Sequence, residues 1–242
     1  MPLSKSELER YQRQLLVDGW DQNKLKNAKV LVAGLGGLGG ASSTYLAAAG
    51  VGNIRLCDSD KVELSNFNRQ ILFSSNDITK SKSIIAQKKL SELNPDIKVE
   101  ALPYKLTEDN AGEIASGCDI IIDGLDNHRD RLILNRVSFA LKIPYIYAAI
   151  NEWQGQLGFL NPPVTACLAC LMPQKTIDSG SVPVVGAVAG VIGSIQATLA
   201  IRYLITGETP LTGKILIFQA DRMEFETLIF DKKPECPVCS RK

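Results

Sequence analysis

The sequence carries almost no net charge, a single histidine and no long uninterrupted apolar run. Its 27 Lys and Arg residues against 26 Asp and Glu residues give a formal net charge of +1, which predicts neither a nucleic acid nor a membrane surface as partner. The most apolar stretch, 182–201, contains Ser194, Gln196 and Thr198, so we expect a buried core helix there and no membrane span. The polar, charged segment 1–14 is typical of neither a signal peptide nor a transit peptide.

Six cysteines are distributed unevenly along the 242 residues. Cys57 and Cys118 stand alone in apolar runs, where cysteine usually acts as a small buried apolar residue. The other four form two Cys-x-x-Cys pairs, namely Cys167 with Cys170 and Cys236 with Cys239. Without an export signal such pairs are more often zinc ligands than disulfides, so we expect a structural zinc site with four cysteine ligands and a cytoplasmic protein. The alternative is two separate redox-active or reduced pairs.

Strand and helix patterns alternate through the first 150 residues, after a polar segment, 1–27, that predicts one or two short helices. Strands are expected at 28–34, 53–58, 97–103, 118–124 and 144–150, with helices at 36–50, 77–93 and 129–141. This alternation predicts an α/β fold, a Rossmann-like, doubly wound and mainly parallel sheet. We interpret 28–150 as a nucleotide-binding half.

The pattern changes after residue 151. A strand running into a proline turn at 154–163, a helix at 186–206 and a strand pair at 214–219 and 224–230 predict that antiparallel strands continue the sheet. The stretch 172–185 has no periodicity, which predicts a loop. We therefore expect a single domain, 1–242, whose second half, 151–242, carries the zinc site.

A glycine-rich loop lies between the first strand and the first long helix. Residues 34–39, GLGGLG, contain G-x-G-x-x-G, and Asp58 ends the second predicted strand. Glycines let the backbone approach a phosphate at a helix N-terminus, and the carboxylate can accept hydrogen bonds from ribose hydroxyls. The motif alone does not separate NAD, FAD, SAM and ATP, and packing of helix against strand is the alternative use of the glycines.

The residues after the second strand favour a triphosphate. A polar loop over 58–70 contains Arg69, and Lys82 begins the next helix pattern, so two cations follow the ribose-binding acid. Asp126 and Asn127 end the fourth strand at the carboxyl edge of the sheet, where Asp126 can hold Mg²⁺. Lys80 is a rival for the role of Lys82, and Asp126 can alternatively cap the following helix.

The chain resembles the ThiF/MoeB/HesA family, relatives of the ubiquitin-activating enzymes. The matching motifs are RYQRQ (10–14), GLGGLG, YLAAAGVG (45–52), D-x-D-x-V-E-x-S-N-x-x-R-Q (58–70), LNP (93–95), DNHRDR (126–131) and both cysteine pairs. The resemblance implies that Gly37 and Asn127 lie against the nucleotide and Asp58 binds the ribose. It places Ser65, Asn66, Asn68, Arg69 and Lys82 around the phosphates. It also implies a homodimer in which Arg13 reaches the partner's site, although Arg13 by itself can be a solvated surface charge.

The resemblance implies an ATP-dependent adenylyltransferase that uses Mg²⁺. Its substrate would be the C-terminal glycine of a ubiquitin-like sulfur-carrier protein similar to ThiS or MoaD. Carriers of this kind serve thiamine and molybdopterin synthesis. Arg13, Arg69, Lys82 and Asp126 would be the catalytic residues, and the half 151–242 would bind the carrier as well as zinc. Many relatives carry a further cysteine in the loop after Cys170, but 171–182 contains none, so we expect the reaction to stop at the acyl-adenylate. The alternatives are the same chemistry on a peptide or small-molecule carboxylate, a non-catalytic scaffold, and a nicotinamide-dependent oxidoreductase.

Overall fold

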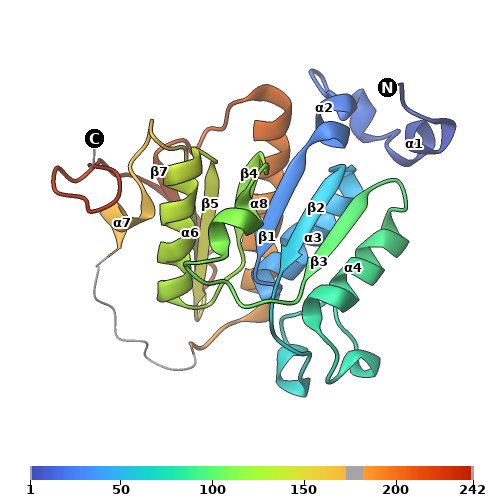
Figure 1. The fold of residues 1–242 in the computed structure, drawn as a ribbon, viewed down its shortest axis with the longest axis horizontal. Helices are drawn as coiled ribbons and strands as arrows, with labels where there is room; N and C mark the ends of the chain where they lie inside the picture. Colours follow the sequence, from blue (N-terminus) through green and yellow to red (C-terminus); the bar gives the residue numbers. More distant parts are fainter. Residues whose placement is uncertain (1, 173–181, 241–242) are drawn as a thin grey trace.

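The computed structural model describes residues 2–172 and 182–240. Eight strands form one sheet in the order β3-β2-β1-β4-β5-β6-β7-β8 (Figure 1). The strands are β1 Lys29–Ala33, β2 Asn53–Cys57, β3 Lys98–Leu102, β4 Ile120–Asp123, β5 Tyr145–Asn151, β6 Gln154–Leu160, β7 Lys214–Gln219 and β8 Glu224–Ile229. Strands β1 to β5 are parallel, and β6, β7 and β8 each run antiparallel to the preceding strand. The predicted parallel sheet with an antiparallel continuation is confirmed.

Strand β1 shows why its sequence is a continuous apolar run. Val30 and Val32 pack into the core on one face of the sheet, whereas Leu31 and Ala33 pack into the core on the other. All four side chains are fully buried, as expected for a parallel strand covered by helices on both sides.

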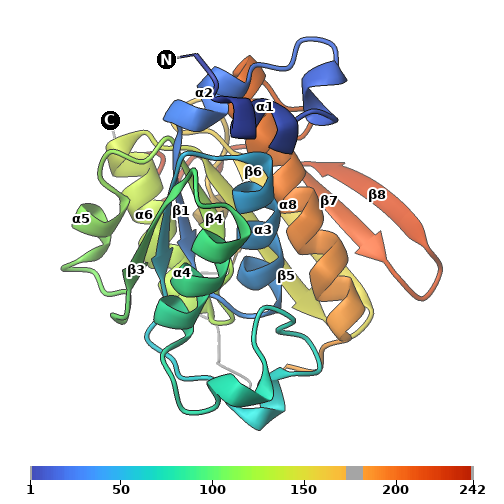
Figure 2. The ribbon, with the colours of Figure 1, turned by 90° about the vertical axis from the view of Figure 1, so that its right-hand side faces the viewer.

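Helices cover both faces of this sheet. They are α1 Lys5–Arg10, α2 Gln22–Asn27, α3 Gly37–Ala49, α4 Lys82–Leu93, α5 Ala111–Ala115, α6 His128–Leu141, α7 Leu168–Leu171 and α8 Gly186–Thr206, with 3-10 turns η1 Gln14–Leu16, η2 Leu64–Asn66 and η3 Ser75–Asp77. Figure 2 shows α3 and α8 on one side of the sheet and α5 and α6 on the other. The arrangement is a three-layer, doubly wound architecture.

Helix α8 is the core helix expected from the apolar stretch. Among the described residues it is the one helix whose length and composition would suffice to cross a membrane. Val188, Ile192 and Ala200 on this helix are buried in the same cluster as strand residues of β1 and β6. Its apolar character is therefore explained by packing within this fold.

The sequence prediction differs from the structure mainly at short elements. Helix α4 begins at Lys82 and not near residue 77, because 75–77 form the separate turn η3. There the carboxylate of Asp77 accepts hydrogen bonds from the N–H and hydroxyl of Ser74, both at 2.8 Å, and pairs with Lys89. The short helices α5 and α7 were not predicted. Of the predicted loop 172–185, residues 173–181 lie outside the described residues.

The loops that follow the adjacent strands β1 and β4 touch each other. A Cβ atom on Gly34 would lie 2.5 Å from the carbonyl oxygen of Gly124, and one on Gly124 would lie 2.2 Å from the carbonyl oxygen of Gly34. Gly34 also has φ of +86°, in the left-handed region. After this contact the chain leaves toward α3 on one face and α6 on the other. Both glycines are required by this close approach.

We predict that Gly124→Ala lowers the free energy of unfolding by about 1–3 kcal/mol, because the added methyl group overlaps backbone atoms that cannot move aside easily. Gly112→Ala is the matched control, since a Cβ there meets no atom within 4 Å and alanine favours helix α5. Urea denaturation of both variants measures the difference. Equal stability of the two variants would contradict the packing argument.

Candidate active site

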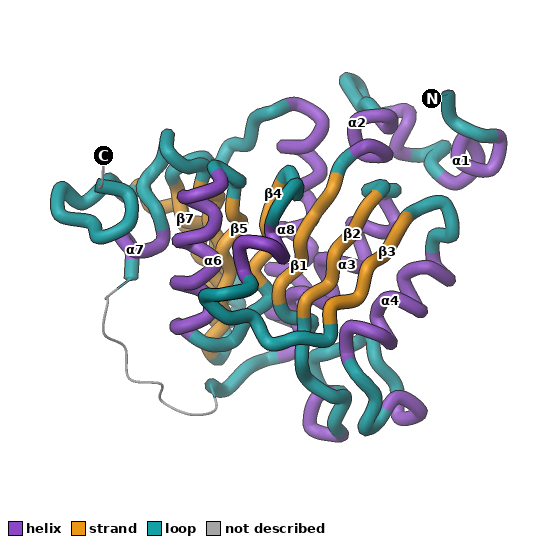
Figure 3. The backbone as a smooth tube through the Cα atoms, viewed as in Figure 1, coloured by secondary structure: helices purple, strands orange, loops and turns teal. Residues whose placement is uncertain are grey.

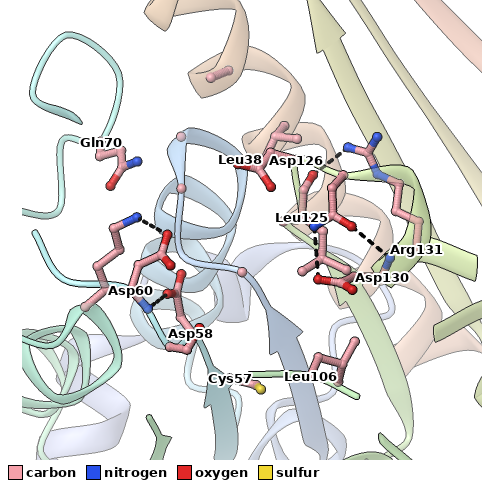
Figure 4. A pocket seen from close by; sticks show the side chains of 18 of the residues that line it. Leu38, Cys57, Asp58, Asp60, Gln70, Leu106, Leu125, Asp126, Asp130 and Arg131 are labelled. Carbon is pink, nitrogen blue, oxygen red and sulfur yellow. Dashed lines mark hydrogen bonds and ion pairs between the residues drawn. The ribbon is translucent and has the colours of Figure 1, made fainter. Parts of the chain in front are cut away.

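A cavity of about 730 Å³ opens at the carboxyl edge of the parallel strands, where the chain turns to opposite faces after β1 and β4. Figure 4 shows the glycine loop passing between Asp58 and Asp60 on one side and Asp126, Asp130 and Arg131 on the other. Of the residues predicted for the site, six line this cavity: Gly37, Asp58, Arg69, Lys82, Asp126 and Asn127. Open α/β sheets bind their ligands in this position.

The glycine loop brings the N-terminus of α3 to the cavity. Gly36 is the N-cap residue, and no side chain caps the helix. The backbone N–H groups of the first turn are therefore available to an anion. A Cβ on Gly37 would lie 2.8 Å from the Cβ of Ala189 and 3.2 Å from the carbonyl oxygen of Arg69, so this glycine also lets α8 and the polar loop pack closely.

Asp58 is fixed at the end of β2 by two backbone groups. Its carboxylate accepts hydrogen bonds from the N–H of Leu35 at 2.7 Å and of Asp60 at 2.8 Å. Burial raises the pKa of Asp58, and the positive charge of Lys82 and the two N–H groups offset this only in part. The hydrogen bond from Leu35 joins Asp58 to the glycine loop, so the acid and the loop are fixed relative to each other.

Lys82 occupies the first position of α4 and is 5% exposed. Its ammonium group pairs with the carboxylate of Asp60 at 3.0 Å, and the Asp60 side chain is 66% exposed. Its rival Lys80 is exposed and is not among the cavity-lining residues. The geometry therefore favours Lys82 as the cation that can meet a ligand in the cavity.

Arg69 is held in place by its own loop, which lies between β2 and α4 (Figure 3). Its guanidinium donates to the carbonyl of Ser65 at 3.0 Å and to the side-chain oxygen of Asn68 at 2.9 Å. Asn66 is 6% exposed, and its side-chain oxygen accepts a hydrogen bond from the N–H of Glu63 at 3.0 Å. Ser65, Asn66 and Asn68 thus lie in the loop that presents Arg69, and they are not among the residues lining the cavity.

Asn127, and not Asp126, caps helix α6. The side-chain oxygen of Asn127 accepts the N–H of Asp130 at 2.9 Å, and its amide donates to the Asp130 carboxylate at 3.0 Å. The alternative capping role of Asp126 is therefore wrong. Its carboxylate is exposed at the cavity, which leaves an oxygen ligand of the kind that Mg²⁺ prefers.

Several lining residues were not singled out from the sequence. Gln70 is 4% exposed, and its side-chain oxygen has no hydrogen-bond partner among the described residues. Arg131 is buried, lies 3.3 Å from the carboxylate of Asp123, and donates to the carbonyls of Leu125 and Ala148. Gln70 belongs to the motif RQ at 69–70, and Arg131 belongs to the motif DNHRDR at 126–131. The signal that could have found them is their place within these motifs, beside Arg69 and Asp126.

Arg13 does not line the cavity of its own protomer. It precedes η1 in the exposed N-terminal segment, and α2 in the same segment leads directly into the amino end of β1. The segment therefore lies at the opposite end of the strands from the glycine loop (Figure 1). A contact between Arg13 and a bound nucleotide needs a second copy of the chain, and the role of Arg13 stays a prediction.

The four paired cysteines come together between α7 and the C-terminal segment, which lies beside α7 in Figure 1. Their sulfur atoms lie within 4.8 Å of one another, with Cys167 to Cys236 at 3.6 Å and Cys170 to Cys239 at 3.3 Å. These separations are too long for a disulfide and close to the sulfur spacing of about 3.8 Å in a tetrahedral zinc site. The donor set fits zinc with no open coordination position, which is typical of a structural site.

Comparisons with known proteins agree with this geometry. The ThiF family matches residues 11–238. A sulfur carrier protein adenylyltransferase of Thermus thermophilus is 38% identical over 99% of this chain and 93% of its own length. A sulfur carrier protein ThiS adenylyltransferase of Escherichia coli is 40% identical over 95% and 94% of the two chains. The crystal structure of E. coli MccB with ATP superimposes with a TM-score of 0.85 at 26% identity, over 96% of this chain and 75% of that one.

A doubly wound α/β fold, a cavity at the carboxyl edge of its parallel strands and a cluster of four cysteines therefore occur together in a chain that matches one family over residues 11–238. The protein belongs to the ThiF family. The resemblance inferred from its motifs is confirmed.

We predict that Cys236→Ser lowers the zinc content from about one ion per chain to near zero, because removing one thiolate opens a closed four-thiolate site. The midpoint of thermal unfolding should fall as well, since the metal joins α7 to the C-terminal segment. Cys118→Ser is the control, because Cys118 is buried outside the cluster. Elemental analysis of the purified proteins decides, and retention of zinc by Cys236→Ser would exclude the site.

Proposed function

We propose that the protein is a cytoplasmic, ATP-dependent adenylyltransferase that activates the C-terminal glycine carboxylate of a ubiquitin-like sulfur-carrier protein and releases pyrophosphate. The observation that carries the proposal is the meeting of Arg69, Lys82 and Asp126 on one cavity beside an uncapped helix N-terminus. The names of the relatives in T. thermophilus and E. coli, together with the similar crystal structure of MccB with ATP, support the same chemistry.

The cavity offers what this reaction requires. A carboxylate oxygen forms a bond to the α-phosphorus of ATP, and the bond from that phosphorus to the pyrophosphate oxygen breaks. Both reactants are anionic at neutral pH, so no general base is needed and like-charge repulsion is the main obstacle. Arg69 and Lys82 would reduce that repulsion and stabilise the charge that develops on the leaving pyrophosphate. Arg13 of the partner subunit would add a third cation.

Lys82 is well placed to change partners during this step. Its present partner, Asp60, is exposed, and an ion pair with an exposed carboxylate contributes little to stability. A bound polyphosphate can therefore compete for the ammonium group at small cost. Burial of the lysine along the wall of the cavity restricts where the ammonium can move.

The charges lining the cavity also suggest a role for magnesium. Four basic side chains (Arg69, Lys82, Lys105 and Arg131) are balanced by four acidic ones (Asp58, Asp60, Asp126 and Asp130). A polyphosphate would therefore meet no net positive charge from side chains alone. We infer that Asp126 holds Mg²⁺, which supplies the missing positive charge at the phosphates.

The reaction should end at the acyl-adenylate. Cys57 is the one described cysteine that lines the cavity. Burial, with the negative charges of Asp58 and Asp130, raises the pKa of its thiol to about 12. The thiolate needed for covalent transfer is therefore not available at Cys57 near neutral pH. The sequence 171–182 contains no cysteine either, so a separate sulfur donor is required.

Exchange of labelled pyrophosphate into ATP tests the function. We expect exchange only when a carrier protein with an intact Gly-Gly terminus is present with Mg²⁺, using ThiS-like and MoaD-like carriers in parallel. A carrier that lacks its last glycine is the control and should support no exchange. Exchange with a short peptide or free amino acid, but with none of the carriers, would instead identify the alternative acceptor.

The same assay includes a matched pair of lysine variants. Lys82→Ala should lower the exchange rate about a hundred- to a thousandfold, the usual effect of removing one group that stabilises transition-state charge. Lys80→Ala removes the same charge two positions away, outside the cavity, and should retain the rate of the unaltered protein. If both variants remain fully active, the cavity is not the reaction site.

Complementation between inactive variants tests the dimer. Arg13→Ala and Asp126→Ala should each be inactive alone, but mixing and subunit exchange should restore roughly a quarter of the unaltered rate. Half of the dimers are then mixed, and each mixed dimer contains one complete site built from both chains. Mixing Asp126→Ala with Lys82→Ala is the control and should restore no activity. Both residues line the cavity of the same chain, so every site in a mixed dimer still lacks one of them. Absence of complementation in the first mixture would place Arg13 outside the site.

A further inference from the structure

Helix α6 carries a buried polar side chain that the proposed chemistry does not use. Asn135 is 2% exposed and lies one helical turn beyond Arg131, on the part of α6 that packs against α7. Helix α7 is the short helix of the first cysteine pair. Asn135 therefore stands where the nucleotide-binding half meets the cysteine cluster.

The two ends of the Asn135 amide have different surroundings. Its side-chain oxygen accepts a hydrogen bond from the backbone N–H of Leu168 at 2.7 Å, and this donor fixes which end is oxygen. The side-chain nitrogen is buried and has no hydrogen bond of ordinary geometry among the described residues. Leu168 directly follows Cys167, so this contact places the amide beside the first cysteine pair, and the Asn135 side chain also interacts with that of Cys167.

Metal binding would supply the acceptor that this nitrogen lacks. A zinc ion with four thiolates has a net charge of about −2, and N–H donors around the sulfur atoms compensate such a charge. Two other cysteines already receive backbone donors, Cys170 from the N–H of Lys233 at 3.4 Å and Cys236 from the N–H of Cys239 at 3.5 Å. Asn135 is placed to give Cys167 the corresponding donor.

We propose that Asn135 is a positioning residue of the cysteine site: its side-chain nitrogen donates to the metal-bound thiolate of Cys167 while its oxygen holds the N–H of Leu168. The amide thus orients the first cysteine pair from helix α6. The cluster is thereby joined to the helix whose N-terminus presents Asp126 and Asn127. This inference concerns metal binding and does not depend on the proposed adenylylation.

Two substitutions separate the two ends of the amide. Asn135→Asp keeps an oxygen for Leu168 and replaces the donor with a second oxygen beside the thiolate. Asn135→Ala removes both. Competition of the zinc-loaded, full-length protein with a chromogenic chelator should show zinc affinity about 10- to 100-fold weaker for both variants. If only the Leu168 contact matters, Asn135→Asp will bind zinc as tightly as the unaltered protein, and the proposal is wrong.

Asn94→Asp is the matched control for loss of a buried amide donor. Asn94 is fully buried, and its amide nitrogen donates to Tyr11 and to the carbonyl of Ala47, away from the cluster. The zinc affinity of the Asn94→Asp variant should equal that of the unaltered protein, even if its free energy of unfolding is lower.

Cobalt substitution gives a readout that a general loss of stability would not imitate. Removal of an N–H donor raises the energy of the sulfur electrons, so the sulfur-to-cobalt charge-transfer band of Asn135→Ala should move to longer wavelength. If Asn135→Asp does not fold, this band in Asn135→Ala decides alone. An unshifted band in Asn135→Ala would overturn the proposal.

Discussion

The contact between the glycine loop after β1 and the loop after β4 is the constraint on which the rest of the molecule depends. These two loops can meet only because Gly34 and Gly124 lack side chains. Beyond the contact, the chain departs to α3 on one face of the sheet and α6 on the other, and the cavity forms between them. The glycine motif therefore has two physical roles that the sequence does not separate. Gly39 serves packing and Gly36 lines the cavity, whereas Gly34 and Gly37 do both.

The electrostatic character of the cavity comes from the backbone as much as from side chains. The first turns of α3, α4 and α6 contribute lining residues, and Val184 and Ala189 line it from the start of α8. Each of these helix ends carries a partial positive charge. The basic and acidic side chains balance, so the fixed dipoles and any bound cation determine the sign of the field. This combination suits a ligand that is anionic along its length and also carries a metal ion.

Much of this architecture was predictable from sequence, because buried parallel strands and long apolar helices leave strong patterns. The strand predicted at 214–219 and the helix predicted at 186–206 match β7 and α8 residue for residue. Short elements were missed, since helices α5 and α7 are too short to show a period. Local hydrogen bonding was also beyond prediction. Asp126 and Asn127 are both good caps by residue type, and only the backbone geometry decides that Asn127 caps and Asp126 faces the cavity.

Helix α6 shows how polar residues can fix one arrangement within an apolar interior. Asn127, Arg131 and Asn135 follow one another at four-residue intervals, so they lie along one side of the helix. Asn127 caps the first turn of α6, and Arg131 donates to the carbonyls of Leu125, after β4, and of Ala148, within β5. Asn135 accepts the N–H of Leu168 in the cysteine segment. Apolar packing tolerates a small rotation or shift of a helix, whereas buried donors and acceptors lose their partners when the helix moves. A shift of α6 that broke the contacts of Arg131 would also disturb the contact between Asn135 and Leu168, so one helix holds both the edge of the cavity and the cysteine cluster.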